Sequence, residues 1–116
     1  MAAAFLNKLA DPSKARGISA GAKPADHVHP VVVQAMRELG IDLSSVTPRL
    51  LTTELAETAN LLVTMGCGEE CPYVSGVEMT DWDVPDPKGQ PIERVREIRD
   101  DIRRRVAALA HERRWV

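Results

Sequence analysis

Apolar residues recur at steps of three and four in three stretches of the chain, and this spacing predicts amphipathic helices. The three stretches are residues 1–10, residues 30–39 and residues 91–113. Pro30 suits the first position of the second helix, and we expect Gly40 to end that helix as a left-handed cap. The chain is therefore expected to be rich in helix, with its longest helix at the carboxyl end.

Other stretches have the length and pattern of strands. The run NLLVTM, residues 60–65, is almost continuously apolar and predicts a strand buried on both faces, as in a parallel sheet. Weaker strands are predicted over residues 77–82 and 14–19, and a short helix over residues 51–59. The resulting order of helix, strand, helix, helix, strand, strand, helix predicts one α/β domain that spans residues 1–116.

Composition and charge exclude several classes of partner. With 44% hydrophobic and 28% charged residues, the composition is typical of an ordinary soluble domain, and the net charge of -2 gives no electrostatic case for nucleic acid or an anionic membrane. The arginines near the carboxyl end alternate with acids, which predicts a solvated helix face. No apolar run reaches the ~20 residues that span a bilayer, and no signal peptide is recognisable, so we expect a cytoplasmic protein.

Two cysteines, Cys67 and Cys71, are separated by three residues in the segment MGCGEECPYVSG, directly after the most buried of the predicted strands. Open α/β sheets bind their ligands at this position, beyond the carboxyl ends of the strands. Two thiols in one loop can form and break an internal disulfide. The alternative interpretation is that both cysteines are small buried hydrophobic residues, and composition alone does not distinguish between these two interpretations.

Neither a metal nor a cofactor is predicted. A structural zinc site needs four ligands, and the three histidines have no ligand spacing relative to the cysteines. His27 and His29 lie just before Pro30, where such residues most often serve as turn and helix-start residues.

Asp86 is a candidate general acid. It lies between Pro85 and Pro87, and the two prolines restrict the backbone on either side, which can hold the carboxyl in a fixed direction. Asp81 and Asp83 precede it in the same segment. A solvated turn aspartate is the alternative interpretation.

Taken together, these segments resemble a known family. The stretches ISAGAKPADHVHPVVVQAMRELGIDLS, NLLVTMGCGEECP and DWDVPDPKG, followed by a long helix, are similar to the arsenate reductases built on the low-molecular-weight protein tyrosine phosphatase fold. The resemblance implies a flavodoxin-like parallel sheet with helices on both faces. It also implies that the first, central strand of this sheet is missing from the chain.

In that family a loop of the form Cys, five residues, Arg follows the first strand and holds the nucleophile and the oxyanion. Here the sixth residue after Cys67 is Tyr73, and the sixth after Cys71 is Val77, so neither cysteine has this signature. We expect the chain as given to be inactive and loosely packed. A start assigned too far downstream is favoured over a truncated remnant or a chain completed by another polypeptide.

The resemblance implies roles for three residues. Asp86 matches the general acid, and Cys67 and Cys71 fall in the region of the redox thiols. The implied substrate is arsenate, and the implied reductant is either thioredoxin or mycothiol with mycoredoxin. A tyrosine phosphatase or a non-catalytic fragment is the alternative, but the paired thiols favour the reductase because a phosphatase needs no resolving thiol.

Overall fold

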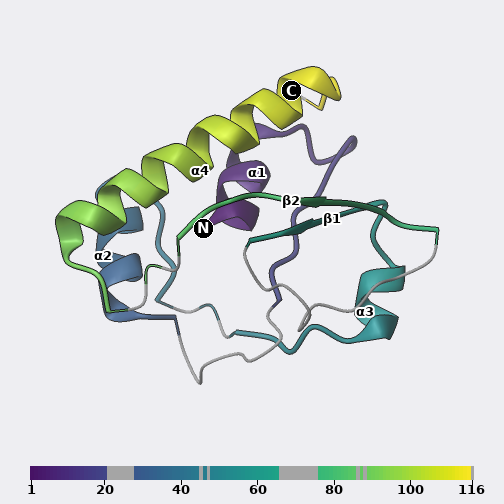
Figure 1. Cartoon of the computed structure of the whole chain (residues 1–116). Helices are drawn as coiled ribbons and strands as arrows, with labels where there is room; N and C mark the ends of the chain where they lie inside the picture. Colours follow the sequence, from purple (N-terminus) through teal and green to yellow (C-terminus); the bar gives the residue numbers. More distant parts are fainter. Residues whose placement is uncertain are drawn as a thin grey trace.

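The computed structural model in Figure 1 contains four helices and two strands in its described part. It describes residues 1–20, 28–44, 46, 48–65, 76–85, 87 and 89–115. In chain order the elements are α1 (Ala2–Leu9), α2 (Pro30–Arg37), α3 (Thr53–Glu57), β1 (Leu61–Thr64), β2 (Glu78–Asp81) and α4 (Ile92–Glu112). All six lie within stretches predicted from the sequence, and each is a little shorter than its prediction.

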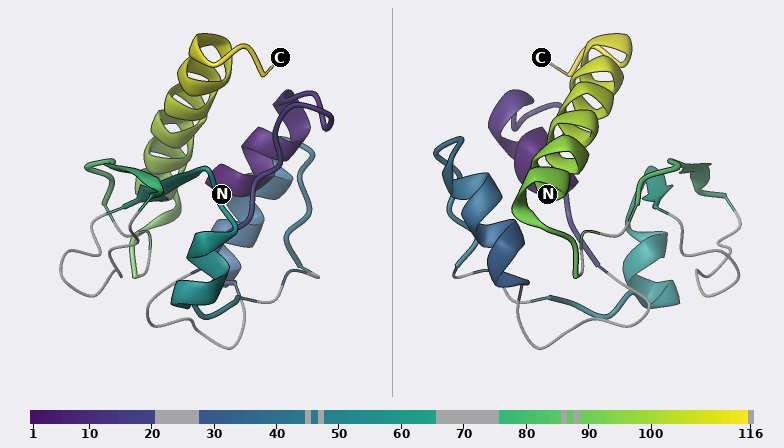
Figure 2. Two further views of the ribbon diagram at one scale, coloured as in Figure 1. Left: turned by 90° about the vertical axis from the view of Figure 1, so that its right-hand side faces the viewer. Right: turned by 60° about the vertical axis from the view of Figure 1, so that its left-hand side comes forward.

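The two strands form a parallel pair. Leu61 pairs with Glu78 and Thr64 with Asp81, so β1 and β2 run side by side and end at the same level. Helix α4 lies on one side of this sheet and α3 on the other (Figures 1 and 2). This arrangement is the predicted α/β architecture with a parallel sheet between helices.

The prediction that β1 is buried on both faces is wrong. All four of its residues are only partly buried. A strand is fully buried only when other strands lie beside it and other elements cover both of its faces. In the described part of the chain, β1 pairs with β2 alone. An apolar sequence therefore marks the strand correctly but overstates its burial here.

The predicted strand over residues 14–19 is also wrong, because the backbone there bonds to other groups. The amides of Lys14 and Ala15 donate to the carbonyl of Asp11 at 2.8 and 3.1 Å. The Asn7 side chain accepts from the Gly17 amide at 2.7 Å and donates to the Gly17 carbonyl at 3.0 Å. An amide side chain on α1 thus makes the pair of bonds that a neighbouring strand would make.

The hydrophobic core lies where α4 crosses α1 and α2. Side chains at steps of three and four along α4 pack against Phe5 of α1 and Met36 of α2, which confirms the predicted helical pattern. The buried residues of α4 in this core are Val95, Ile98, Ile102 and Val106. No helix in the described part of the chain has both the length and the apolar character needed to cross a membrane.

A buried arginine joins α2 to α4. Arg99 is 8% exposed, and its guanidinium donates to the Ala35 carbonyl at 2.9 Å and to Glu38 at 2.8 Å. Arg96 makes a two-pronged bond to the same carboxylate, which holds the pKa of Glu38 below its usual value. The predicted solvated arginine face is therefore wrong at Arg99, because this side chain satisfies a carbonyl near the end of α2.

Gly40 ends the turn after α2 in the predicted left-handed conformation, with a φ of 77°. Its amide donates to the Arg37 carbonyl at 2.9 Å, and the Ile41 amide donates to Met36 at 3.1 Å. These two bonds are the usual pair at a helix end with a left-handed glycine. The prediction of this cap is confirmed.

Candidate functional site

The carboxyl edge of the sheet positions the segments that carry the predicted chemistry. Thr64 and Asp81 are the last residues of β1 and β2, and they are partners in the strand register. Beyond them, the Trp82 amide donates to the Thr64 carbonyl at 2.7 Å. Because both strands run in the same direction, the segments that follow them leave the sheet at the same edge.

A side-chain bond also crosses this edge. The Thr64 hydroxyl donates to Oδ1 of Asp81 at 2.6 Å, so the two strand ends are joined by side chains as well as by the backbone. Sequence reasoning did not single out Thr64. Two features of the sequence could have identified it. Thr64 is the last polar residue before the cysteine segment, and Asp81 holds the corresponding place at the end of the next predicted strand.

The predicted site residues themselves lie outside the described residues. Cys67 and Cys71 fall between Met65 and Gly76, and Asp86 falls between Pro85 and Pro87. The structure therefore fixes where the two segments start, and it does not test the three assignments. Thiol relay and general acid catalysis stay predictions for these residues.

The backbone is hydrogen-bonded on both sides of the segment that contains Asp86, and the side nearer β2 is also buried. Val84 is 7% exposed, and its amide donates to the Trp82 carbonyl at 2.9 Å. On the far side, the Gln90 amide donates to the Pro87 carbonyl at 3.1 Å, directly before α4 begins. Asp83, two residues beyond β2, is exposed.

The predicted helix start at the histidine segment is confirmed for one of its two residues. His29 is the N-terminal cap residue of α2, and its carbonyl accepts from the amides of Val32 and Val33 at 3.0 and 3.1 Å. His27 lies outside the described residues. Within the described ranges, no group of three metal-binding side chains comes together.

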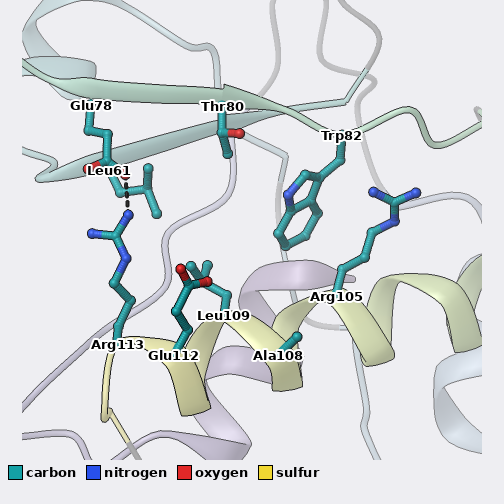
Figure 3. Close-up of a pocket in the computed structure, with 9 residues that line it drawn as sticks. All are labelled: Leu61, Glu78, Thr80, Trp82, Arg105, Ala108, Leu109, Glu112 and Arg113. Carbon is teal, nitrogen blue, oxygen red and sulfur yellow. Dashed lines mark hydrogen bonds and ion pairs between the residues drawn. The ribbon is translucent and has the colours of Figure 1, made fainter.

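A cavity of 380 Å³ lies between the sheet and α4 (Figure 3). Trp82 and Arg105 lie at one end, and the ion pair between Glu78 and Arg113 lies at the other. This pair raises the pKa of the Arg113 guanidinium. The other lining residues are Leu61, Thr80, Ala108, Leu109 and Glu112. Because the segments that contain Cys67, Cys71 and Asp86 follow β1 and β2, we place the candidate site at the carboxyl edge of the sheet instead.

Comparison with known proteins identifies relatives along most of the chain. A Halobacterium salinarum protein that bears the provisional name arsenate reductase is 46% identical over 95 residues, which are 82% of this chain and 67% of the relative. An arsenate reductase of Staphylococcus aureus strain Newman is 34% identical over 80 residues, which are 66% of this chain and 60% of the relative.

A solved structure has the same fold. The thioredoxin-dependent arsenate reductase of Corynebacterium glutamicum superposes with a TM-score of 0.80 at 31% identity, covering 97% of this chain and 54% of that one. Across these three relatives the chain spans between 54% and 67% of the relative's own length. The model of the family described as low molecular weight phosphotyrosine protein phosphatase matches residues 1–114. The chain belongs to the low molecular weight phosphotyrosine protein phosphatase family.

Proposed function

We propose that the protein to which these 116 residues belong is a cytoplasmic arsenate reductase that uses a relay of thiols. The observation that supports this most is the shared edge of the sheet, since the segment with both cysteines and the segment with Asp86 leave β1 and β2 in register. The names of the three relatives support the same substrate. A reducing cytoplasm would keep the thiols available.

The proposed reaction starts with a cysteine of the form Cys, five residues, Arg, which the 116 residues do not contain. Its thiolate forms a sulfur–arsenic bond and displaces a hydroxyl group from arsenate, breaking an arsenic–oxygen bond. Asp86 gives a proton to that oxygen, so it leaves as water. The anion is held during this step by the backbone amides of the nucleophile loop.

Reduction follows when a second thiolate attacks the sulfur of the adduct. A disulfide forms, the electron pair of the sulfur–arsenic bond stays on arsenic, and arsenite leaves. We assign this second thiol to one of Cys67 and Cys71, and the other then attacks the new disulfide and frees the nucleophile. The resulting disulfide between Cys67 and Cys71 is reduced by an external dithiol.

We propose a thioredoxin-type protein as that dithiol, because the Corynebacterium relative is named for its thioredoxin dependence. A mycothiol and mycoredoxin system would instead take the arsenic from the nucleophile and would need neither loop cysteine. The two reductants therefore make different demands on Cys67 and Cys71.

The test is arsenite formation by the protein from the longest reading frame that contains these residues, with thioredoxin, its reductase and NADPH. Asp86→Asn should lower turnover by about 10²- to 10⁴-fold with little change in arsenate binding, whereas Asp83→Asn, at an exposed aspartate three residues earlier, should not. Cys71→Ser should give at most one turnover, because either the attack on the adduct or the release of the nucleophile is then lost. Hydrolysis of para-nitrophenyl phosphate without arsenate reduction would favour the phosphatase that the family name suggests.

A further inference from the structure

We propose that a groove between the end of α2 and the middle of α4 binds an acidic segment of a partner protein. The groove has a volume of 540 Å³. It is lined by Leu39, Arg99, Asp100, Arg103, Arg104 and Ala107. None of these residues belongs to β1 or β2 or to the segments that follow them, so this proposal does not depend on the proposed function.

The groove carries positive charge that the protein does not neutralise itself. Arg103 and Arg104 are both exposed on α4. Arg103 has no carboxylate partner among the described residues, and the Nη2 atom of Arg104 lies 3.7 Å from Asp101, an acid that also binds Arg105 at 3.1 Å. By contrast, Arg99 is already paired with Glu38 and Asp100, so Arg103 and Arg104 are the guanidiniums available to a ligand.

A third cation approaches from α1. The Lys8 ammonium donates to the Leu39 carbonyl at 3.3 Å, and this partner is neutral, so the lysine charge is not cancelled there. Leu39 also lines the groove, which places Lys8 beside it. The end of α1 therefore adds a cation within hydrogen-bond distance of a residue that lines the groove.

The floor of the groove is apolar and favours a peptide over a small anion. Leu39 packs partly buried against the core, and Ala107 is half-buried. Inorganic phosphate would leave most of this space empty. A peptide segment that alternates acids with aliphatic residues can pair with the arginines and cover the floor at the same time.

Charge elsewhere on the chain disfavours nucleic acid as the occupant. Residues 51–90 contain eight acids and one lysine, whereas residues 91–116 contain eight arginines and five acids. With a net charge of -2, the chain as a whole does not attract a long polyanion, whereas a short acidic segment can pair with the local arginines alone.

The test measures fluorescence anisotropy of a fluorescein-labelled peptide of glutamates and leucines, with a matched peptide in which lysine replaces glutamate. We expect saturable binding of the first peptide alone, weakened as salt rises from about 50 to about 500 mM. Arg103→Gln combined with Arg104→Gln should weaken binding about tenfold. Arg16→Gln combined with Arg49→Gln, which removes the same charge from exposed sites elsewhere, should not.

Thermal unfolding of both double variants provides the folding control, because all four side chains are exposed and both variants should unfold like the parent. Several results would overturn the proposal. These are equal binding of the two peptides, equal weakening by the two double variants, or full competition by millimolar inorganic phosphate. Tighter binding of a single-stranded oligonucleotide that the Arg103 and Arg104 changes abolish would assign the groove to nucleic acid instead.

Discussion

Replacing Arg99 by alanine should destabilise the fold well beyond the loss of a surface ion pair. The side chain is 8% exposed, and its three hydrogen bonds reach the Ala35 carbonyl at 2.9 Å, Glu38 at 2.8 Å and Asp100 at 2.9 Å. After the change, Glu38 keeps its bonds from Arg96, and Asp100 turns to water, since its side chain is 47% exposed. The buried Ala35 carbonyl, however, loses a charged donor.

The expected loss is about 2 kcal/mol, because a hydrogen bond from a charged donor to a buried acceptor contributes roughly 1.5–3 kcal/mol. For a domain of this size that loss corresponds to a melting temperature lower by about 8 °C. Urea unfolding followed by tryptophan fluorescence measures it. Arg96→Ala is the matched control, since its guanidinium binds the same carboxylate from an exposed position. Equal losses for the two variants would refute the assigned role of the buried carbonyl.

Three further predictions concern stability. Gly17→Ala should cost about 1–3 kcal/mol in urea unfolding, because the new Cβ would lie 3.0 Å from the Cα and carbonyl oxygen of Ala3; no loss would contradict this packing. Arg114→Gly should add about 1 kcal/mol, since Arg114 has a φ of 59°, and Arg114→Ala should bring no such gain. The bond from Arg96 lowers the pKa of Glu38 in the folded protein. The stability that this bond contributes is therefore fully present above the pKa of Glu38 in the unfolded chain, near 4.5, and is lost as pH falls through the lower pKa of the folded protein. The stability difference between Glu38→Gln and the parent should therefore shrink as pH falls below about 4.5, and a constant difference would contradict the linkage.

The helices could be predicted from the sequence because their burial follows local periodicity. Val95, Ile98 and Ile102 occur at the spacing of one helix face, and that face is the one that packs in the core. Gly40 was equally predictable, since few residues other than glycine favour a φ of 77°. Both signals depend on neighbours in the sequence alone.

The features that were missed depend on contacts between distant residues. The segment around Gly17 has a strand-like composition, but Asn7 takes its hydrogen bonds. Arg99 sits among alternating charges, and its burial depends on a carbonyl 64 residues earlier in the chain. Neither partner can be identified from a local pattern.

The sequence predicts where in the fold the candidate site lies, but it does not predict how the side chains there are arranged. The sequence placed Cys67 and Cys71 after one strand and Asp86 after the next, and the parallel register of β1 and β2 brings both segments to one edge. The bond between Thr64 and Asp81 at that edge was not foreseen, because it depends on the register of strands that are separated by 13 residues.

The central proposal, a relay through the two loop thiols, is tested most directly by one single-turnover measurement. The protein from the longest reading frame that contains these residues is mixed with arsenate without any reductant, quenched with an alkylating agent and analysed by peptide mass spectrometry. The account predicts about one equivalent of arsenite per protein, with Cys67 and Cys71 joined in a disulfide and protected from alkylation. Release of arsenite with both cysteines fully alkylated would contradict it.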